Sequence, residues 1–341
     1  MNTDKKIAVV ILNWNGRQMM RDFLPSVVKH SEKWARVIVA DNASTDGSVE
    51  MLREEFPMVE TLVLDRNYGF AEGYNRALAQ VDAQYYVLLN SDVEVDDDWL
   101  APMLDYMEQH PDVAACQPKL LAQRSKDSFE YAGAAGGFLD KYGYPFCRGR
   151  IFNIVELDQR QYDAPCDILW ATGAALFIRS SDWRESGGLD GRFFAHMEEI
   201  DLCWRLRKRG RRIVCLPQSH AYHVGGATLD QGNPRKTYLN FRNNLLMLYK
   251  NLDEAELNSV MRVRTVLDYV AALKFLVALD VANFKAVMRA RADYRKMRAD
   301  FKPQREENLR KTTHEPRERF TFSLLWQFYA RGKKKFSDLD V

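Results

Sequence analysis

Oxygen-bearing side chains cluster directly after the apolar run 85–89, where the sequence reads Asn90-Ser91-Asp92-Val93-Glu94. Closely spaced carboxylate and amide oxygens at the end of a buried strand suit Mg²⁺ or Mn²⁺. A diphosphate ligand would need such a cation to offset its negative charge. The segment is therefore a candidate divalent-cation site centred on Asp92.

A second pair of carboxylates, Glu198 and Glu199, opens a segment whose apolar residues recur with helical spacing as far as residue 209. A helix N-terminus favours the ionised form of nearby carboxylates, and a general base must be ionised. An acidic first helical turn with no catalytic role has the same pattern. From the pattern alone, the two interpretations are equally supported.

His223 is a third candidate, in the segment Tyr222-His223-Val224-Gly225-Gly226. A neutral imidazole at this position would complete a metal shell begun by Asp92. The two glycines would let the backbone approach a ligand closely. The alternative is a structural histidine at the end of a strand, so the motif is weak evidence by itself.

The elements that must position these residues follow a regular pattern in the first 90 positions. Apolar, β-branched runs at 7–12, 37–40, 61–64 and 85–89 alternate with stretches of helical spacing. Such alternation predicts a parallel sheet with crossover helices, and nearly continuous apolar strands indicate a sheet covered on both faces. We expect an α/β, Rossmann-like half.

Polar residues follow each of the four expected strands, at 13–16, 41–48, 65–70 and 90–94. Ligands of such sheets bind beyond the carboxyl ends of the strands, so four polar loops at one edge indicate a polar ligand. The sequence has neither GxGxxG after the first strand nor GxxxxGK[ST]. These absences argue against a dinucleotide fingerprint and a P-loop.

Composition narrows the class of protein. The 341 residues are 46% hydrophobic and carry a net charge of +2, which argues for a sizeable core and against a nucleic-acid partner. Five cysteines without a CxxC motif argue against a zinc site and a disulfide scaffold. With no signal peptide and no run of 18 apolar residues, we expect a reducing, cytoplasmic location without a membrane span.

The C-terminal part differs in charge from the rest of the chain. Residues 285–341 contain 16 Lys and Arg against 8 Asp and Glu, and helical spacing recurs at 236–251, 259–282 and 284–302. The segment 320–335 joins aromatic residues to a basic cluster. It suits a membrane interface, with Trp326 and Phe328 among the headgroups and lysines 333–335 on anionic lipid. The alternatives are a docked helix and a contact within a homodimer.

The motifs together resemble a known family. ILNWNG, VADNASTDGS, RNYGFAEGYNRAL, LLNSDVEV, ATGAALFIR, FFAHMEEIDLCWRLRKRG and HVGGAT occur in the order and spacing of family 2 glycosyltransferases with the GT-A fold. More narrowly, the chain is similar to the bacterial rhamnosyltransferase-like branch, over roughly residues 6–250. The resemblance implies a Rossmann-like, mostly parallel sheet flanked by helices. It implies a catalytic domain at 1–230, with a nucleotide-sugar part at about 1–95 and an acceptor and catalytic part at about 96–230. A helical, basic region at 231–341 follows.

The resemblance also implies roles for individual residues. Asn90-Ser91-Asp92 occupies the position of the family's DxD motif, with Asn replacing the first Asp, so Asp92 is the expected metal ligand and His223 a further one. Glu199 stands where the family has an aspartate base, and because the residue type differs, Glu198 is the alternative base. The residues implied in nucleotide-sugar binding are Asn13, Asn15, Asp41, Asn67, Gly69, Asn75 and Asn90.

The implied activity is inverting transfer of a sugar from a UDP-, dTDP- or GDP-sugar, with Mg²⁺ or Mn²⁺, to a hydroxyl of a glycan or lipid-linked acceptor. Such a reaction would belong to cell-surface polysaccharide synthesis at the inner face of the cytoplasmic membrane. One alternative is a sugar-nucleotide nucleotidyltransferase, although the expected glycine-rich, basic loop after the first strand is missing. Another is a non-catalytic carbohydrate-binding protein derived from the same fold.

Overall fold

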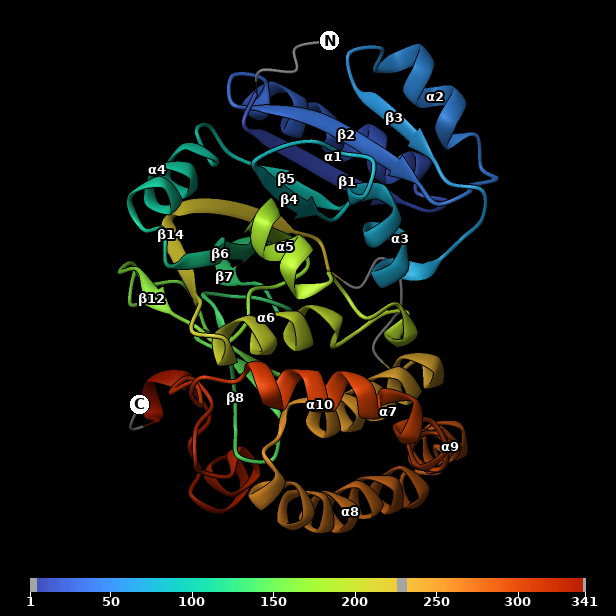
Figure 1. Cartoon of the computed structure of the whole chain (residues 1–341), viewed down its shortest axis with the longest axis vertical. Coiled ribbons are helices and arrows are strands. Elements are labelled where there is room, and N and C mark those ends of the chain that lie inside the picture. Colours follow the sequence, from blue (N-terminus) through green and yellow to red (C-terminus); the bar gives the residue numbers. More distant parts are fainter. Residues whose placement is uncertain (1–4, 226–231, 340–341) are drawn as a thin grey trace.

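The computed structural model describes residues 5–225 and 232–339. In this part of the chain, a ten-stranded sheet runs in the order β12-β14-β6-β13-β4-β1-β2-β3, with β5 paired to β14 and β7 to β6. Figure 1 shows this sheet above a group of C-terminal helices. The strands of this sheet are β1 (Ile7–Asn13), β2 (Ala35–Asp41), β3 (Glu60–Val63), β4 (Tyr85–Leu89), β5 (Val93–Val95), β6 (Val113–Ala122), β7 (Ser125–Phe129), β12 (Cys166–Asp167), β13 (Ala175–Arg179) and β14 (Arg212–His223).

Helices flank the sheet, and a small antiparallel sheet lies beside it. The helices are α1 (Arg17–Ser31), α2 (Ser48–Glu55), α3 (Gly69–Leu78), α4 (Ala101–Gln109), α5 (Ser180–Ser186), α6 (Glu198–Lys208), α7 (Pro234–Asn251), α8 (Glu254–Val277), α9 (Val281–Met297) and α10 (Lys302–Lys311). The small sheet contains β8 (Gly137–Leu139), β9 (Pro145–Cys147), β10 (Arg150–Ile151) and β11 (Ile154–Val155).

The N-terminal half confirms the expected parallel sheet. Strands β3, β2, β1 and β4 are neighbours and run parallel. Along β1, Ala8 and Val10 belong to one hydrophobic core, while Ile7, Val9 and Ile11 belong to another. The sheet is thus covered on both faces, and the polar residues that follow its strands meet at one edge.

The second half of the sheet is mixed. Antiparallel β13 lies between β4 and β6, and β14 runs parallel to β6. The sequence predicts one strand over 168–178, which is wrong, because β13 begins only at Ala175. Before it, the Thr172 amide donates to Gln117 Oε1 at 2.9 Å, and Thr172 Oγ1 accepts from the Ala174 amide at 3.2 Å. These bonds hold a turn that takes the chain out of the ladder.

The C-terminal helices are docked on the sheet domain through buried charges. Asp201 of α6 is fully buried and accepts from Lys250 Nζ at 2.7 Å and from Asn251 Nδ2 at 2.8 Å, both on α7. Arg205 Nε lies 3.0 Å from the same carboxylate. Figure 1 shows α6 between the sheet and the C-terminal helices, as these contacts require. The expected domain boundary at 230/231 falls in segment 226–231, outside the described residues, together with Gly226; the division stays a prediction.

Segment 320–335 is mostly irregular, with a short helical stretch at Trp326–Ala330. The Phe328 ring is buried and packs edge-on against Phe152, with ring centroids 5.0 Å apart. The prediction that Phe328 lies among lipid headgroups is therefore wrong, since the ring faces the protein. Trp326 and Tyr329 remain exposed. Throughout residues 5–225 and 232–339, no helix has the combination of length and apolar composition required for a bilayer span.

Candidate active site

A cavity of about 400 Å³ opens where the strands of the parallel half end and where α3 and α6 begin. It gathers seven of the sequence-predicted site residues, from four separate parts of the chain: Asn67, Gly69, Asn90, Asp92, Glu198, Glu199 and His223. The other residues of the lining are Leu12, Trp14, Asn42, Phe70, Ser91, Ala132, Thr172, Gly173, Ala174, Phe194, Ala195, His196, Arg235 and Lys236. Two carboxylate groups predicted to do different chemistry, Asp92 and Glu199, therefore share one cavity.

Asp92 and His223 contact each other at one side of this cavity. His223 Nε2 lies 3.1 Å from Asp92 Oδ1 and 3.3 Å from Asn90 Nδ2. On the other side of the ring, His223 Nδ1 lies 3.2 Å from Glu130 Oε1. Glu130 is itself fixed, because it accepts from the Ala132 and Gly133 amides. The Glu130 carboxylate thus orients the imidazole so that Nε2 faces Asp92.

Two carboxylates change the titration of His223. Burial would lower the pKa of His223, but the hydrogen bonds and charges of Asp92 and Glu130 outweigh burial and raise it to about 10. Burial would likewise raise the pKa of Asp92, but the hydrogen bond and charge of His223 hold it below its ordinary value. Without a cation, Asp92 is therefore ionised and His223 carries a proton at neutral pH.

Glu198 and Glu199 occupy the first turn of α6. Glu198 Oε2 and Glu199 Oε2 are buried, and neither accepts a hydrogen bond from the described residues. Burial raises the pKa of Glu199 to about 7, and burial together with the Glu199 charge raises the pKa of Glu198 well above its ordinary value. The expectation that the helix terminus keeps both ionised is wrong, because desolvation outweighs the dipole.

The loop before α6 holds this carboxylate pair in an unusual backbone geometry. Phe194, His196 and Met197 all have positive φ, of 67°, 71° and 74°. Such conformations cost energy in residues with a Cβ and persist only where the surroundings hold them. Asn243 Nδ2 on α7 donates to the carbonyls of Phe193, Ala195 and His196 at 2.8–3.0 Å. The C-terminal helix α7 therefore fixes the entry to the acidic helix turn.

Asn13, Asn15 and Asp41 lie outside the cavity lining; Asn13 and Asp41 are the last residues of β1 and β2, and Asn15 belongs to the loop after β1. Asn13 Nδ2 donates to Asp41 Oδ1 at 3.0 Å and to Ser44 Oγ at 3.2 Å. Asn15 Oδ1 accepts from the Thr45 amide at 2.8 Å. Asn13 Oδ1 is buried without a described partner. These bonds join the loops after β1 and β2, and the donor-binding roles of the three residues stay predictions.

Asn67 and Gly69 line the cavity at the start of α3. Asn67 Oδ1 accepts from the Gly69 amide at 2.8 Å and from Asn42 Nδ2 at 3.2 Å. Gly69 has a φ of 75°, and a Cβ there would lie 2.5 Å from Phe194 Cδ2. The turn therefore requires glycine for its backbone conformation and for its contact with the loop before α6.

Asn75 and Glu94 lie away from this cavity. Asn75 Nδ2 donates to the Leu189 carbonyl at 2.7 Å, and Asn75 Oδ1 accepts from the Leu189 amide at 3.0 Å. Glu94 accepts from Lys126 Nζ at 2.6 Å and from Gln123 Nε2 at 3.3 Å. Asn75 thus has a structural explanation, and its assignment to donor binding stays a prediction.

Several residues at the site were not singled out from the sequence. Asn42 and His196 lie in motifs quoted above but were assigned no role there, whereas Arg235, in the lining, and Glu130, behind His223, lie in segments without a recognisable motif. Burial and the charge of Lys236 lower the pKa of His196 to about 4, so its ring is neutral at pH 7. Only the three-dimensional packing of α6 and α7 brings such residues to the cavity.

The donor set for a cation is small. Within residues 5–225 and 232–339, no group of three or more His, Cys, Asp or Glu side chains is arranged to hold a metal ion. Asp92 and His223 contribute one carboxylate and one imidazole to the cavity. A cation bound there would need further ligands, such as water and substrate phosphates, as is usual for Mg²⁺.

Parts of this chain are similar in sequence to known glycosyltransferases. The family model "Glycosyl transferase family 2" matches residues 8–168, which include the parallel half of the sheet and the Asn90–Asp92 segment. An N-acetylglucosaminyl-diphospho-decaprenol L-rhamnosyltransferase of Mycobacterium tuberculosis is 27% identical over 235 residues, which cover 64% of this chain and 75% of that protein.

Two further similarities extend the match. The rhamnosyltransferase WbbL of Escherichia coli is 28% identical over 163 residues, covering 46% of this chain and 61% of that protein. The fold is similar to the crystal structure of GalNAc-T7 with UDP, GalNAc and Mn²⁺, with a TM-score of 0.60 and 17% identity over 92% of this chain and 58% of that chain. Residues 8–168 thus match glycosyltransferase family 2, and the chain is a glycosyltransferase with a GT-A-like fold.

Proposed function

We propose that this chain is an inverting glycosyltransferase that moves a sugar from a nucleotide-sugar to a hydroxyl of a glycan or lipid-linked acceptor, in cell-surface polysaccharide synthesis. One observation carries the proposal: the acidic turn Glu198-Glu199 shares a cavity with Asn90, Asp92 and His223, although more than a hundred positions separate Glu199 from Asp92. A cavity with a base at one side and anion-compensating groups at another suits transfer from a diphosphate leaving group.

Glu199 is the better candidate for the base. Its pKa of about 7 lets it be ionised near neutral pH and yet accept a proton readily, whereas the pKa of Glu198 is raised further by the Glu199 charge. Two carboxyls whose environments separate their pKa values take different roles. Glu198 then stays protonated beside its ionised neighbour.

The chemical step is a single displacement at the anomeric carbon of the donor sugar. The acceptor hydroxyl oxygen forms a bond to this carbon while the bond from the carbon to the diphosphate oxygen breaks. Glu199 takes the hydroxyl proton, and the electron pair of the broken bond leaves with the nucleoside diphosphate. Attack from the face opposite the leaving group inverts the configuration, and general-base help contributes about 10²–10⁴ in rate.

Asp92 and His223 fit a Mg²⁺ or Mn²⁺ ion. Both line the cavity, their polar atoms are 3.1 Å apart, and Glu130 supports the second ring nitrogen as a carboxylate behind a metal-bound histidine does. A bound ion would offset the negative charge of the diphosphate. A histidine ligand must lose its Nε2 proton, so metal affinity should rise with pH. The GalNAc-T7 structure, of similar fold, contains Mn²⁺ and UDP.

The remaining polar residues support a donor-binding role. Asn67, Gly69 and Asn90 line the cavity directly, and the bonds of Asn13, Asn15 and Asp41 join the chain segments at the ends of β1 and β2. The M. tuberculosis relative is named for a diphosphate-linked lipid acceptor and for rhamnose. These names favour a lipid-linked acceptor and a deoxyhexose donor for this chain as well.

A donor-hydrolysis assay with UDP-, GDP- and dTDP-sugars, with and without Mn²⁺, tests the proposal. We expect one nucleotide-sugar to be hydrolysed slowly without an acceptor and faster with Mn²⁺. Turnover of a nucleoside triphosphate plus a sugar phosphate, with release of pyrophosphate, would instead identify a nucleotidyltransferase. Binding of sugars without any turnover would identify a carbohydrate-binding protein and refute the proposal.

A further inference from the structure

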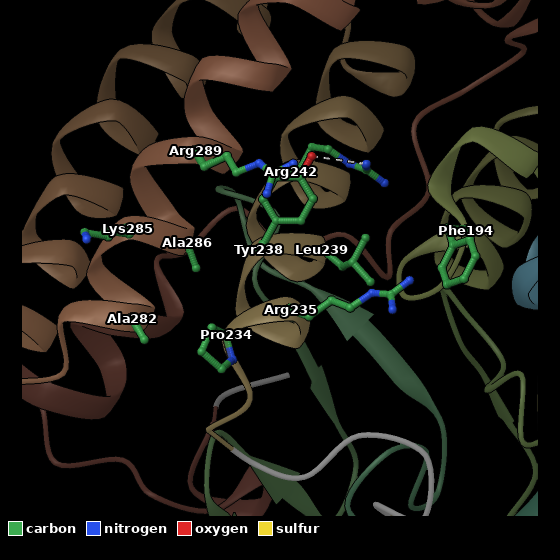
Figure 2. Close-up of a pocket in the computed structure, with 10 residues that line it drawn as sticks. All are labelled: Phe194, Pro234, Arg235, Tyr238, Leu239, Arg242, Ala282, Lys285, Ala286 and Arg289. Atoms are coloured by element: carbon green, nitrogen blue, oxygen red, sulfur yellow. Dashed lines mark hydrogen bonds between the residues drawn. The ribbon is translucent and has the colours of Figure 1, made fainter.

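A second cavity of about 660 Å³ lies between α7 and α9, beside the candidate active site. Phe194 and Arg235 line both cavities, so the two adjoin at the loop before α6. Figure 2 shows Arg235 extending from the start of α7 toward Phe194, with the α9 residues on the other side of the cavity. A ligand that extended from this cavity to Glu199 would pass Phe194 and Arg235, which both cavities share.

The lining of this cavity is strongly basic. It contains no acidic side chain and four basic ones: Arg235, Arg242, Lys285 and Arg289. The other residues of the lining are Phe194, Pro234, Tyr238, Leu239, Ala282 and Ala286. Arg242 donates to the Phe193 carbonyl, and Arg289 Nε lies 3.5 Å from Asp293 Oδ2. Arg235 and Lys285 are exposed, and neither forms an ion pair with a carboxylate of the described residues. Their charges are available to an anion.

One helix N-terminus adds to this positive field. Pro234 and Arg235 belong to the first turn of the 18-residue helix α7, whose N-cap is the uncharged Asn233. The N-terminus of a long helix carries a partial positive charge that favours anions, above all phosphates. The start of α9 does not add to it, because the Asp280 carboxylate caps that helix and accepts from the Asn283 amide at 3.0 Å. The α7 terminus beside four basic side chains suits a group with more than one negative charge.

Exposed apolar residues lie next to this cavity along the chain, at the turn from α8 to α9, which we call the α8–α9 corner. Directly before Ala282, at the turn from α8 to α9, Val277 is 77% exposed and Leu279 is 86% exposed. Further exposed apolar residues on α8 and at the start of α9 are Val266, Val270, Leu273, Leu276 and Val281. Isolated exposed apolar residues are common, but a group at one corner indicates a contact surface.

We propose that this cavity binds the phosphate-class anion of an amphiphilic acceptor, a diphosphate joined to a hydrocarbon chain, and that the chain lies against the α8–α9 corner. The inference rests on the proposed function, because it supplies the acceptor that Glu199 deprotonates. Arg235 marks the path between the two cavities, so the anion sits on α7 and α9 while the reacting hydroxyl reaches the active site.

The test uses the full chain with its donor site saturated by the nucleoside diphosphate that binds it, so that added phosphates report on the second cavity. Calorimetry then compares geranyl diphosphate, inorganic pyrophosphate and geraniol. We expect geranyl diphosphate to bind most tightly, pyrophosphate more weakly and geraniol not measurably. The double variant Lys285→Ala/Arg289→Ala should weaken geranyl diphosphate binding about 10-fold or more, since charged hydrogen-bond partners are lost.

The matched control is Arg295→Ala/Lys296→Ala, which removes two exposed basic residues of the same helix outside the cavity. It should bind geranyl diphosphate as the wild type does. Equal binding to the wild type and to Lys285→Ala/Arg289→Ala would overturn the proposal. Equal affinity for pyrophosphate and geranyl diphosphate would show that the cavity binds a free phosphate group, and it would overturn the proposal that a hydrocarbon chain binds at the α8–α9 corner.

Sedimentation distinguishes a second copy of the chain from a hydrocarbon chain at the corner. Two results together would contradict the proposal: the wild type is a dimer that Leu279→Asp converts to a monomer, and Leu279→Asp leaves the affinity for geranyl diphosphate unchanged. The α8–α9 corner would then be a self-association surface. Failure of the proposed function would give a different result. No nucleotide-sugar would then be turned over, while the calorimetric titrations would still measure binding to the cavity.

Discussion

At the scale of the residue, the site depends on how burial and neighbouring charge change individual side chains. Asp92 and His223 keep opposite charges because they contact each other, whereas Glu199 is half-buried and its Oε2 atom has no hydrogen-bond donor among the described residues. The residue types and their order in the chain were sufficient to nominate these groups. The pKa values were not predictable, because they depend on burial and on Glu130, which no motif marks.

Substitution of the two glutamates separates their roles. Glu199→Gln should lower the transfer rate about 10²–10⁴-fold, because the amide cannot accept the hydroxyl proton. Glu198→Gln should lower it by less than about 10-fold, since an amide resembles the protonated carboxyl that Glu198 keeps. The check is kcat at saturating donor and acceptor, with donor affinity measured by calorimetry. A larger loss in Glu198→Gln than in Glu199→Gln would exchange the two assignments.

The pH dependence of kcat/KM follows from the pKa of Glu199. Because burial raises this pKa to about 7, the carboxyl keeps its proton below that pH, and kcat/KM should fall about tenfold per pH unit on the acid side. The profile is measured at saturating Mn²⁺, so that metal binding at His223 does not change with pH, and the pKa of His196, about 4, produces no limb near pH 7. An acid limb that persists near pH 7 in the residual activity of Glu199→Gln would contradict the assignment.

At the scale of the element, the turns at the ends of strands and helices position the site. The parallel half of the sheet and helices α1–α3 were predictable, because their apolar runs and helical spacing alternate plainly. The break before β13 was not, since the run of apolar residues continues through it while Gln117, distant in sequence, holds the turn. The hydrogen bonds from Asn243 to the loop before α6 were not predictable either, because they join segments 50 positions apart.

The turn at Gly69 offers a test of this positioning. Gly69→Ala strains a φ of 75° and places a Cβ 2.5 Å from the Phe194 ring, whereas Gly187→Ala strains a φ of 81° with no atom within 4 Å. We expect Gly69→Ala to cost about 1–3 kcal/mol more in the free energy of unfolding and to raise the donor KM. Urea denaturation and steady-state kinetics measure both, and equal effects of the two substitutions would show that the Phe194 contact has no influence.

At the scale of the whole molecule, the C-terminal helices belong to the site as well as to the scaffold. Lys250 on α7 bonds to Asp201 on α6 and to Asp190, and Asn243 on the same helix fixes the loop that precedes Glu198. The helical character of this region was predictable from its spacing. Its docking was not, because Asp201 and Lys250 are charged residues that a sequence pattern assigns to the surface, although both are buried here.

Removing one partner of this buried network should destabilise the fold. Lys250→Met leaves Asp190 and Asp201 without their shared cation, at an expected cost of about 3 kcal/mol in the free energy of unfolding. The control Lys311→Met removes an exposed pair with Glu307 on α10, at an expected cost of about 0–1 kcal/mol. Urea denaturation measures both free energies of unfolding. If Lys250→Met costs no more than Lys311→Met, the buried network does not contribute to the docking of α7.

The most direct measurement is a crystal structure of the Glu199→Gln variant with Mn²⁺ and the nucleotide-sugar that the wild type hydrolyses. We predict that the diphosphate lies against Asp92 and His223 and that the anomeric carbon is directed toward position 199. A donor bound in the basic cavity between α7 and α9, or with its sugar turned away from position 199, would contradict the account.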